Sequence, residues 1–186
     1  MANLSNHFLV ASPNLHNFTF AKTVFYISDH DEEIGAVGVV INKPIGKQLE
    51  KVFQDLKVQD NNHILKDNYL FWGGPMCTDN GYFLHSINSY GKPIFELTNN
   101  KNVLIDMIQN RNCTDLFISL GYTSLHEMQL EEEVKSGNWL VVPANKDLIF
   151  DVDPMDRYEE ALHLLGIKSL GQLLSSYEVG EHLIYS

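Results

Sequence analysis

Basic residues are scarce in this sequence. Only 13 of its 186 residues are lysine or arginine, against 24 aspartates and glutamates, which gives a net charge of −11 at pH 7. Proteins that bind nucleic acids use clustered lysines and arginines, which displace counterions from the phosphate backbone. The sequence contains no such cluster. We therefore do not expect direct nucleic-acid binding, and the same deficit disfavours attachment to anionic membrane surfaces.

Cysteine is nearly absent. Cys77 and Cys113 are the only two cysteines, and their separation matches neither a CxxC motif nor the ligand spacing of a zinc site. We interpret both as small, buried or half-buried side chains of a protein in a reducing compartment. Whether the two thiols approach each other is left open, because sequence does not give the distance between them.

Long hydrophobic runs are also missing. No stretch reaches the 18 consecutive apolar residues that indicate a membrane-spanning helix. The first residues, MANLSNHFLVASPN, lack the basic region and the apolar core of a signal peptide. The sequence therefore predicts a cytoplasmic protein with no membrane span.

The remaining composition is that of an ordinary globular domain, with 44% hydrophobic and 20% charged residues. A chain of this length can bury one sizeable core but is short for two. No internal repeat, low-complexity tract or linker interrupts it. We predict a single domain over residues 1–186.

Short apolar runs alternate with amphipathic segments along the chain. Strands are predicted at residues 7–11, 23–27, 36–41, 69–72, 81–86, 93–97, 115–122 and 138–142. The run at 36–41 is apolar throughout and should be buried on both faces, whereas the strand at 115–122 should end at its glycine. A polar link at 31–35 joins two of these strands as in a hairpin. The pattern predicts a mixed sheet with flanking helices.

Helical periodicity appears in four places. Helices are predicted at residues 47–56, at 100–110, after Ser124, and from Asp153-Pro154 to Gly166, the last of them burying Met155, Tyr158, Leu162 and Leu165. A polar surface loop is expected at 57–68, and a short helix from Ser169 onward is left open.

The helix after Ser124 carries the most specific local signal. Ser124 and Glu127 have the spacing of a capping box at a helix start. Leu125, Met128 and Val134 should then face inward. The glutamates at 131–133 are interpreted as a solvated face.

The stretch FWGGPMCTDNGYFLH, at residues 71–85, raises the question of a phosphate-binding loop. Pro75 lacks an N–H donor, and the residues that follow predict a strand rather than the helix that such a loop precedes. We therefore interpret Gly73, Gly74 and Pro75 as a sharp turn between two strands, with a second turn at 79–81. The rigid polar loop between these turns, which includes Asp79, remains a secondary candidate for ligand contact.

Two histidines are candidates for acid–base or metal chemistry. His30 lies among the carboxylates of Asp29-His30-Asp31-Glu32-Glu33, which indicates either a divalent-metal site or, as we prefer, a charged hairpin in water. His85 shares one strand face with Phe83 and is interpreted as a core histidine bonded to a backbone carbonyl. Neither HExxH nor GxSxG occurs, so no cofactor, metal or nucleophile is expected.

Five stretches in order along the chain carry a family resemblance. They are NHFLVASP near the start, GAVGVVINKP (35–44), GGPMCTDNGYFLH (73–85), LGYTSLHEMQLEEEVKSGNWLVVPA (120–144) and FDVDPMDRYEEALHLLG (150–166). Together, over residues 4–167, they resemble the YqgE/AlgH family of small bacterial proteins. The resemblance implies an α+β fold, in which a strongly bent, bifurcated mixed β-sheet closes toward a pseudo-barrel and is flanked by helices.

The resemblance implies less about function. The family carries the label of transcriptional regulator, linked to alginate production in one branch, and has no agreed activity from which a catalytic residue could be carried over. This chain also departs from the family pattern. Asn6 stands where the family usually has glycine, and Asn80 where it usually has arginine. Losing that arginine removes a bidentate donor and counts against anion binding by the loop.

These observations favour a non-catalytic bacterial regulator that acts through protein partners or a small ligand. The alternative is a metal-assisted or acid–base hydrolase that uses His30, His85 and Asp79 in one pocket. A third interpretation is a scaffold protein whose partner surface lies on the 57–68 loop or on the acidic helix. The candidate binding residues are His30, Asn42, Gly73, Gly74, Pro75, Asp79 and His85.

Overall fold

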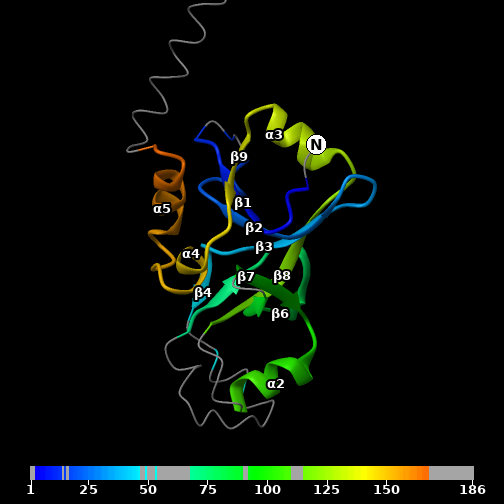
Figure 1. Cartoon of the computed structure of the whole chain (residues 1–186), viewed down its shortest axis with the longest axis vertical. Helices are drawn as coiled ribbons and strands as arrows, with labels where there is room; N and C mark the ends of the chain where they lie inside the picture. Colours follow the sequence, from blue (N-terminus) through cyan, green and yellow to red (C-terminus); the bar gives the residue numbers. More distant parts are fainter. Residues whose placement is uncertain are drawn as a thin grey trace, which may run out of the picture.

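The computed structural model describes residues 3–13, 15, 17–46, 49, 53, 68–89, 92–109 and 115–167. Its strands are β1 (His7–Ala11), β2 (Val24–Asp31), β3 (Gly35–Val40), β4 (Pro44–Gly46), β5 (Leu70–Trp72), β6 (Met76–Ser89), β7 (Lys92–Thr98), β8 (Leu116–Leu125) and β9 (Trp139–Pro143). Its helices are α2 (Lys101–Gln109), α3 (Gln129–Lys135), α4 (Lys146–Phe150) and α5 (Arg157–Leu164). Helices α2 and α3 lie at opposite ends of the long axis, with α4 and α5 along one side (Figure 1).

The strands form one mixed sheet in the order β4-β5-β8-β3-β2-β1-β9, and β6 pairs with both β7 and β8. Only β5 and β8 run parallel among the described pairs. The sheet divides beside β8. Strand β3 pairs with β8 as far as Gly38, and beyond it Gly73, just after β5, donates to the Leu120 carbonyl and accepts from the Val40 N–H. The expected α+β fold with a bent, bifurcated mixed sheet is confirmed.

Successive side chains along the central strands pack alternately into two separate hydrophobic clusters. On β6, Leu84 joins the larger cluster and Phe83 the smaller one, and on β8 Phe117 and Ile118 divide in the same way. Successive side chains of a strand point to opposite faces, so this part of the sheet is covered on both sides. Each buried Leu, Ile or Phe contributes about 1.5–3 kcal/mol to folding. The smaller cluster is closed by α2, through Leu104 and Ile108, as the periodicity predicted.

The start of α3 differs from the prediction. Strand β8 does not end at Gly121 but continues to Leu125, because Val37 and Ser124 are paired in the β3–β8 ladder. Ser124 is therefore not a helix cap, and α3 starts after Met128, which has a left-handed φ of 62° and no side-chain cap. Met128 is 57% exposed, and the residue that α3 buries is Leu130.

The start of α5 also lies later than predicted. Residues 154–156 form a turn, in which Asp153 accepts from the Met155 N–H, and the helix begins at Arg157. Met155 is consequently 76% exposed, whereas Tyr158 and Leu162 are buried as expected. Gly166, with φ 77°, follows the helix at the predicted position. Helix α4 was not predicted, although Asn145 caps it by accepting from the Leu148 N–H.

Several predictions fall on other parts of the chain. Of the predicted 47–56 helix, Leu49 and Phe53 are described, and both are helical and buried. Residues 57–67, Cys113 and the tail from Ser169 lie outside the described residues. Cys77 is a free, exposed thiol, so its predicted burial is wrong. In the described part of the chain, no helix has the length and apolarity needed to cross a membrane.

Candidate functional site

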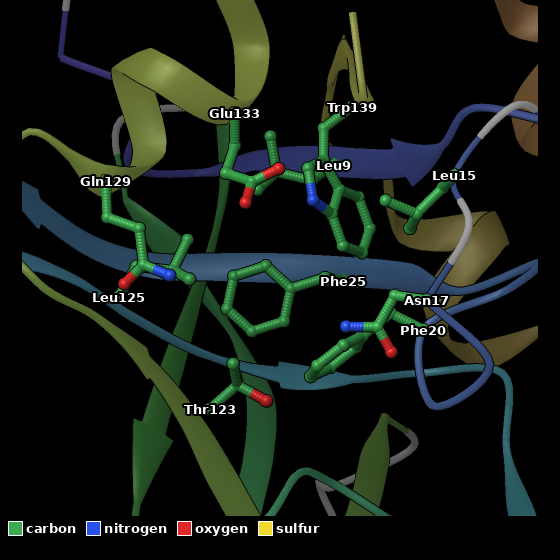
Figure 2. Close-up of a pocket in the computed structure, with 10 residues that line it drawn as sticks. All are labelled: Leu9, Leu15, Asn17, Phe20, Phe25, Thr123, Leu125, Gln129, Glu133 and Trp139. Carbon is green, nitrogen blue, oxygen red and sulfur yellow. The ribbon is translucent and has the colours of Figure 1, made fainter. Parts of the chain in front are cut away.

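A cavity of about 100 Å³, which we call the Glu133 cavity, lies at the α3 end of the sheet (Figure 2). Strands β1, β2, β8 and β9 form its floor and walls, α3 covers one side, and the segment between β1 and β2 covers another. Its lining residues are Leu9, Leu15, Asn17, Phe20, Phe25, Thr123, Leu125, Gln129, Glu133 and Trp139. Most of this surface is apolar or aromatic, as in small-molecule sites generally.

Two amide side chains at the edge of the cavity are held in fixed orientations. The Asn17 Oδ1 atom accepts from the Thr19 N–H at 3.0 Å, and the Gln129 Oε1 atom accepts from the His126 N–H at 3.0 Å. Each amide oxygen is thereby occupied, and the amide nitrogens have no partner among the described residues. Figure 2 shows the Asn17 nitrogen turned toward the Phe25 ring. The cavity therefore has directed N–H donors at its rim.

Among the described residues that line this cavity, Glu133 is the only charged one. Its Oε2 atom accepts from Asn138 Nδ2 at 2.9 Å, which fixes the carboxylate, and Oε1 has no partner in the described part of the chain. The carboxylate points into the cavity beside Leu9 and Trp139 (Figure 2). An acceptor-only carboxylate above aromatic rings favours a cation or a strong donor. The predicted solvated face of α3 is thus wrong at Glu133.

The segment that closes the cavity is held by the predicted binding residue Asn42 and by its neighbour. Asn42 Oδ1 accepts from the Val24 N–H, and Asn42 Nδ2 donates to the Lys22 carbonyl, both at 2.8 Å. Lys43 donates to the Thr19 carbonyl and lies over the Trp72 ring. Burial lowers the pKa of the Lys43 amino group. Both side chains thus position the cavity wall, and neither lines the cavity.

His30 is buried, with 2% exposure, so the expectation that it lies in water is wrong, although the acidic residues of the predicted hairpin around it are exposed. Its Nδ1 atom accepts from the Leu4 N–H at 3.0 Å, which leaves the proton on Nε2 to be donated to Glu131 Oε1 at 3.0 Å. The Ser5 hydroxyl oxygen accepts from the His30 backbone N–H. The carboxylate beside the imidazole therefore comes from α3 and not from the neighbouring acids, and the pair ties the N-terminal segment to α3.

The Gly73-Gly74-Pro75 stretch reverses the chain between β5 and β6, as predicted, and its backbone also passes close to that of β8. A Cβ atom on Gly73 would lie 2.2 Å from the Gly121 carbonyl oxygen, and one on Gly74 would lie 2.3 Å from that of Tyr122. Only glycine allows such an approach. The predicted turn at 79–81, by contrast, is wrong, because these residues belong to β6, whose register against β8 shifts between Met76 and Gly81.

Asp79 and His85 lie along β6 and do not meet His30 in any described contact. Asp79 is exposed. His85 Nε2 is buried without a hydrogen bond among the described residues and lies 4.0 Å from Glu96 Oε2, so the predicted bond to a backbone carbonyl is wrong. No contact in the described structure therefore brings the predicted hydrolase residues together. Within the described ranges, no three His, Cys, Asp or Glu side chains gather as for a metal ion.

Sequence reasoning missed the residues that line the cavity. Glu133 and Gln129 were placed on a helix whose start was misassigned, and Trp139 was assigned only to a buried strand. Phe20 lies in a segment without regular periodicity. The one available signal was the pair of strand-forming residues Tyr122 and Thr123 beyond Gly121, through which β8 continues to Leu125. The apparent capping box of Ser124 and Glu127 indicated instead that the strand ended before these residues.

Comparison with known proteins identifies relatives over most of the chain. The AlgH-like family model matches residues 8–170, close to the range that carries the resemblance. A UPF0301 protein of Coxiella burnetii is 36% identical over 164 residues, which cover 88% of this chain and 90% of the relative. A UPF0301 protein of Polaromonas sp. is 37% identical over 180 residues, which cover 91% of this chain and 92% of the relative.

Two solved structures have a similar fold. The solution structure of the AlgH protein from Pseudomonas aeruginosa aligns with a TM-score of 0.71 and 34% identity, over 89% of this chain and 90% of that one. The crystal structure of a Corynebacterium diphtheriae protein aligns with a TM-score of 0.67 over 89% of this chain and 92% of that one. Its 15% identity shows a shared fold alone.

Proposed function

The chain belongs to the AlgH-like family, and from that premise we propose that it is a non-catalytic regulator that binds a small ligand in the Glu133 cavity and signals to a protein partner. The observation that carries the proposal is the fixed carboxylate of Glu133 at an aromatic cavity, with one oxygen unpaired among the described residues. A fixed carboxylate can recognise a ligand by its charge, so this role requires neither a nucleophile nor an acid–base pair in the cavity.

The cavity favours a small amine with an apolar body. An ammonium group can donate to Glu133 Oε1 while the apolar body contacts Phe25 and Trp139. The volume of about 100 Å³ lies below the ~150 Å³ of a cavity that holds benzene, so a short alkyl chain fills it. An anion would meet the Glu133 carboxylate and be repelled.

The cavity wall offers a route to a partner. Phe18 lies between Asn17 and Phe20, which both line the cavity, and its own side chain is 98% exposed. A ligand that contacts Asn17 and Phe20 therefore biases the segment that displays Phe18. A fully exposed aromatic is a frequent anchor in protein–protein contacts.

The ligand is tested with matched probes. Butylamine, 1-butanol and butyrate share a short alkyl chain and differ in charge, and the indole N–H resonance of Trp139 reports on the cavity. We expect butylamine to bind at least about tenfold more tightly than the other two, and Glu133→Gln to remove that preference. Glu132→Gln, on an exposed neighbour in the same helix, is the control. Equal binding of the three probes, or of butylamine to both variants, contradicts the proposal.

The partner is tested separately. The unaltered chain is first used to capture a protein from its host cells, and binding is repeated with that protein in purified form. Phe18→Ser is expected to lose this binding and to retain binding of butylamine. If the partner binds Phe18→Ser as tightly as the unaltered chain, Phe18 is not part of the partner surface. The proposal that the Glu133 cavity binds a ligand is not affected by that result.

A further inference from the structure

A second cavity, of about 230 Å³, lies between the beginning of β8 and the corner formed by α4 and α5. We call it the Arg157 cavity. Its lining includes the aromatic residues Tyr69, Phe71 and Phe117, and its charged side chains are Arg157, Asp151 and Asp153. None of these residues belongs to the Glu133 cavity, so the two can be tested independently.

Arg157 is a buried cation with part of its hydrogen-bonding capacity unused. Its side chain is 4% exposed, Nε donates to the Val152 carbonyl at 3.0 Å, and Nη1 donates to the Ile41 carbonyl. The guanidinium also lies over the Phe71 ring, with Cζ 5.0 Å from the centroid. Nη2 has no partner among the described residues, and none of their carboxylates forms an ion pair with Arg157.

An unpaired buried charge destabilises a protein, so such a group is retained where it has a use. Burial lowers the pKa of the Arg157 guanidinium to about 10, although Asp153 partly opposes the shift. The guanidinium remains charged at neutral pH. Nη2 together with the remaining N–H of Nη1, in a cavity lined by aromatic residues, is suited to a carboxylate, which accepts two parallel N–H bonds.

The two aspartates restrict the ligand further. Asp151 and Asp153 are exposed, so they lie at the mouth of the cavity while Arg157 lies at its depth. A simple anion would be repelled at the mouth, and a simple cation would leave Arg157 unpaired. A ligand with a carboxylate at one end and an ammonium group nearby satisfies both.

We propose that the Arg157 cavity binds a small zwitterion with the charge pattern of a free amino acid, its carboxylate on Arg157 and its ammonium group toward Asp151 and Asp153. The cavity is larger than the ~150 Å³ that holds benzene and smaller than the ~300 Å³ of drug-sized sites, which suits a molecule of this size. The aromatic wall takes an apolar side chain.

The test uses the full chain and the common free amino acids as probes. Thermal shift at millimolar concentration identifies the best amino acid, and titration calorimetry then compares it with its N-acetyl and carboxamide forms. We expect both modified forms to bind at least about tenfold more weakly, because each lacks one charge. If no amino acid raises the melting temperature, or the modified forms bind as well as the parent, the proposal is overturned.

Variants locate the site. Asp151→Asn combined with Asp153→Asn should weaken binding about tenfold, whereas Glu159→Gln, on the exposed surface of α5, should leave it unchanged. Arg157→Lys keeps the charge but removes the planar fork, and should also weaken binding. Because Arg157 is buried, its replacement also alters packing. The decisive variant is therefore the exposed pair Asp151→Asn and Asp153→Asn, and unchanged amino-acid affinity in that variant overturns the proposal. Glu133→Gln must retain amino-acid binding, which separates this site from the Glu133 cavity.

Discussion

At the scale of single residues, the chemistry of this molecule depends on partners that lie far apart in the sequence. His30 and Glu131 are separated by 101 positions, yet they form a buried pair at 3.0 Å. Glu131 Oε2 is buried without a hydrogen bond among the described residues, so this carboxylate is held mainly through Oε1. Three consecutive glutamates on α3 thereby acquire three different roles: Glu131 binds His30, Glu132 faces solvent and Glu133 lines a cavity.

The first prediction separates two of these glutamates. Glu131→Ala leaves the His30 Nε2–H without an acceptor in a buried position, which should lower the free energy of unfolding by about 1–3 kcal/mol. Glu132→Ala removes an exposed neighbour in the same helix and should change it by less than about 0.5 kcal/mol. Urea unfolding followed by circular dichroism measures both. Equal losses would show that the pair with His30 contributes nothing to stability.

At the scale of elements, the connection from β5 to β6 passes against β8 so closely that three glycines are needed. Gly121 has φ 73°, and a Cβ atom on it would lie 2.5 Å from the Gly74 carbonyl oxygen and 2.8 Å from that of Met76. This is the point at which β3 separates from β8 and β5 enters the sheet. The close approach of the two backbones therefore supports the bifurcation of the sheet.

Two glycines with the same backbone conformation test this crossing. Gly137 has φ 74°, and a Cβ atom on it would meet no described atom within 4 Å, so Gly137→Ala should cost only the left-handed backbone penalty of about 1–2 kcal/mol. Gly121→Ala adds a clash with two carbonyl oxygens, and should cost a further ~1–3 kcal/mol. Chemical unfolding compares the two. A loss at Gly121 no larger than that at Gly137 would mean that the crossing relaxes without cost.

At the scale of the whole molecule, the strands were predictable and the sites were not. Apolar runs and alternation located β1, β3, β5 and β9, and the collinear family stretches predicted the bent, divided sheet. The cavities were not predicted because their walls combine segments that lie far apart in the sequence, which no local pattern joins. The misassigned start of α3 shows the same limit: Ser124 has the spacing of a helix cap, but its pairing with Val37 in the sheet prevails.

The net charge of −11 is the property of the whole molecule that bears most directly on how it acts. If the chain influences transcription, this charge requires a protein partner, because phosphate contacts supply most of the affinity for DNA. We expect fluorescence anisotropy with duplex DNA at about 150 mM NaCl to show binding weaker than about 100 µM, the weak end of ordinary non-specific affinity. Binding that appears only at about 20 mM NaCl would be non-specific attraction, which salt removes. Sequence-selective binding below about 1 µM at the higher salt concentration would contradict the partner-dependent mode of action.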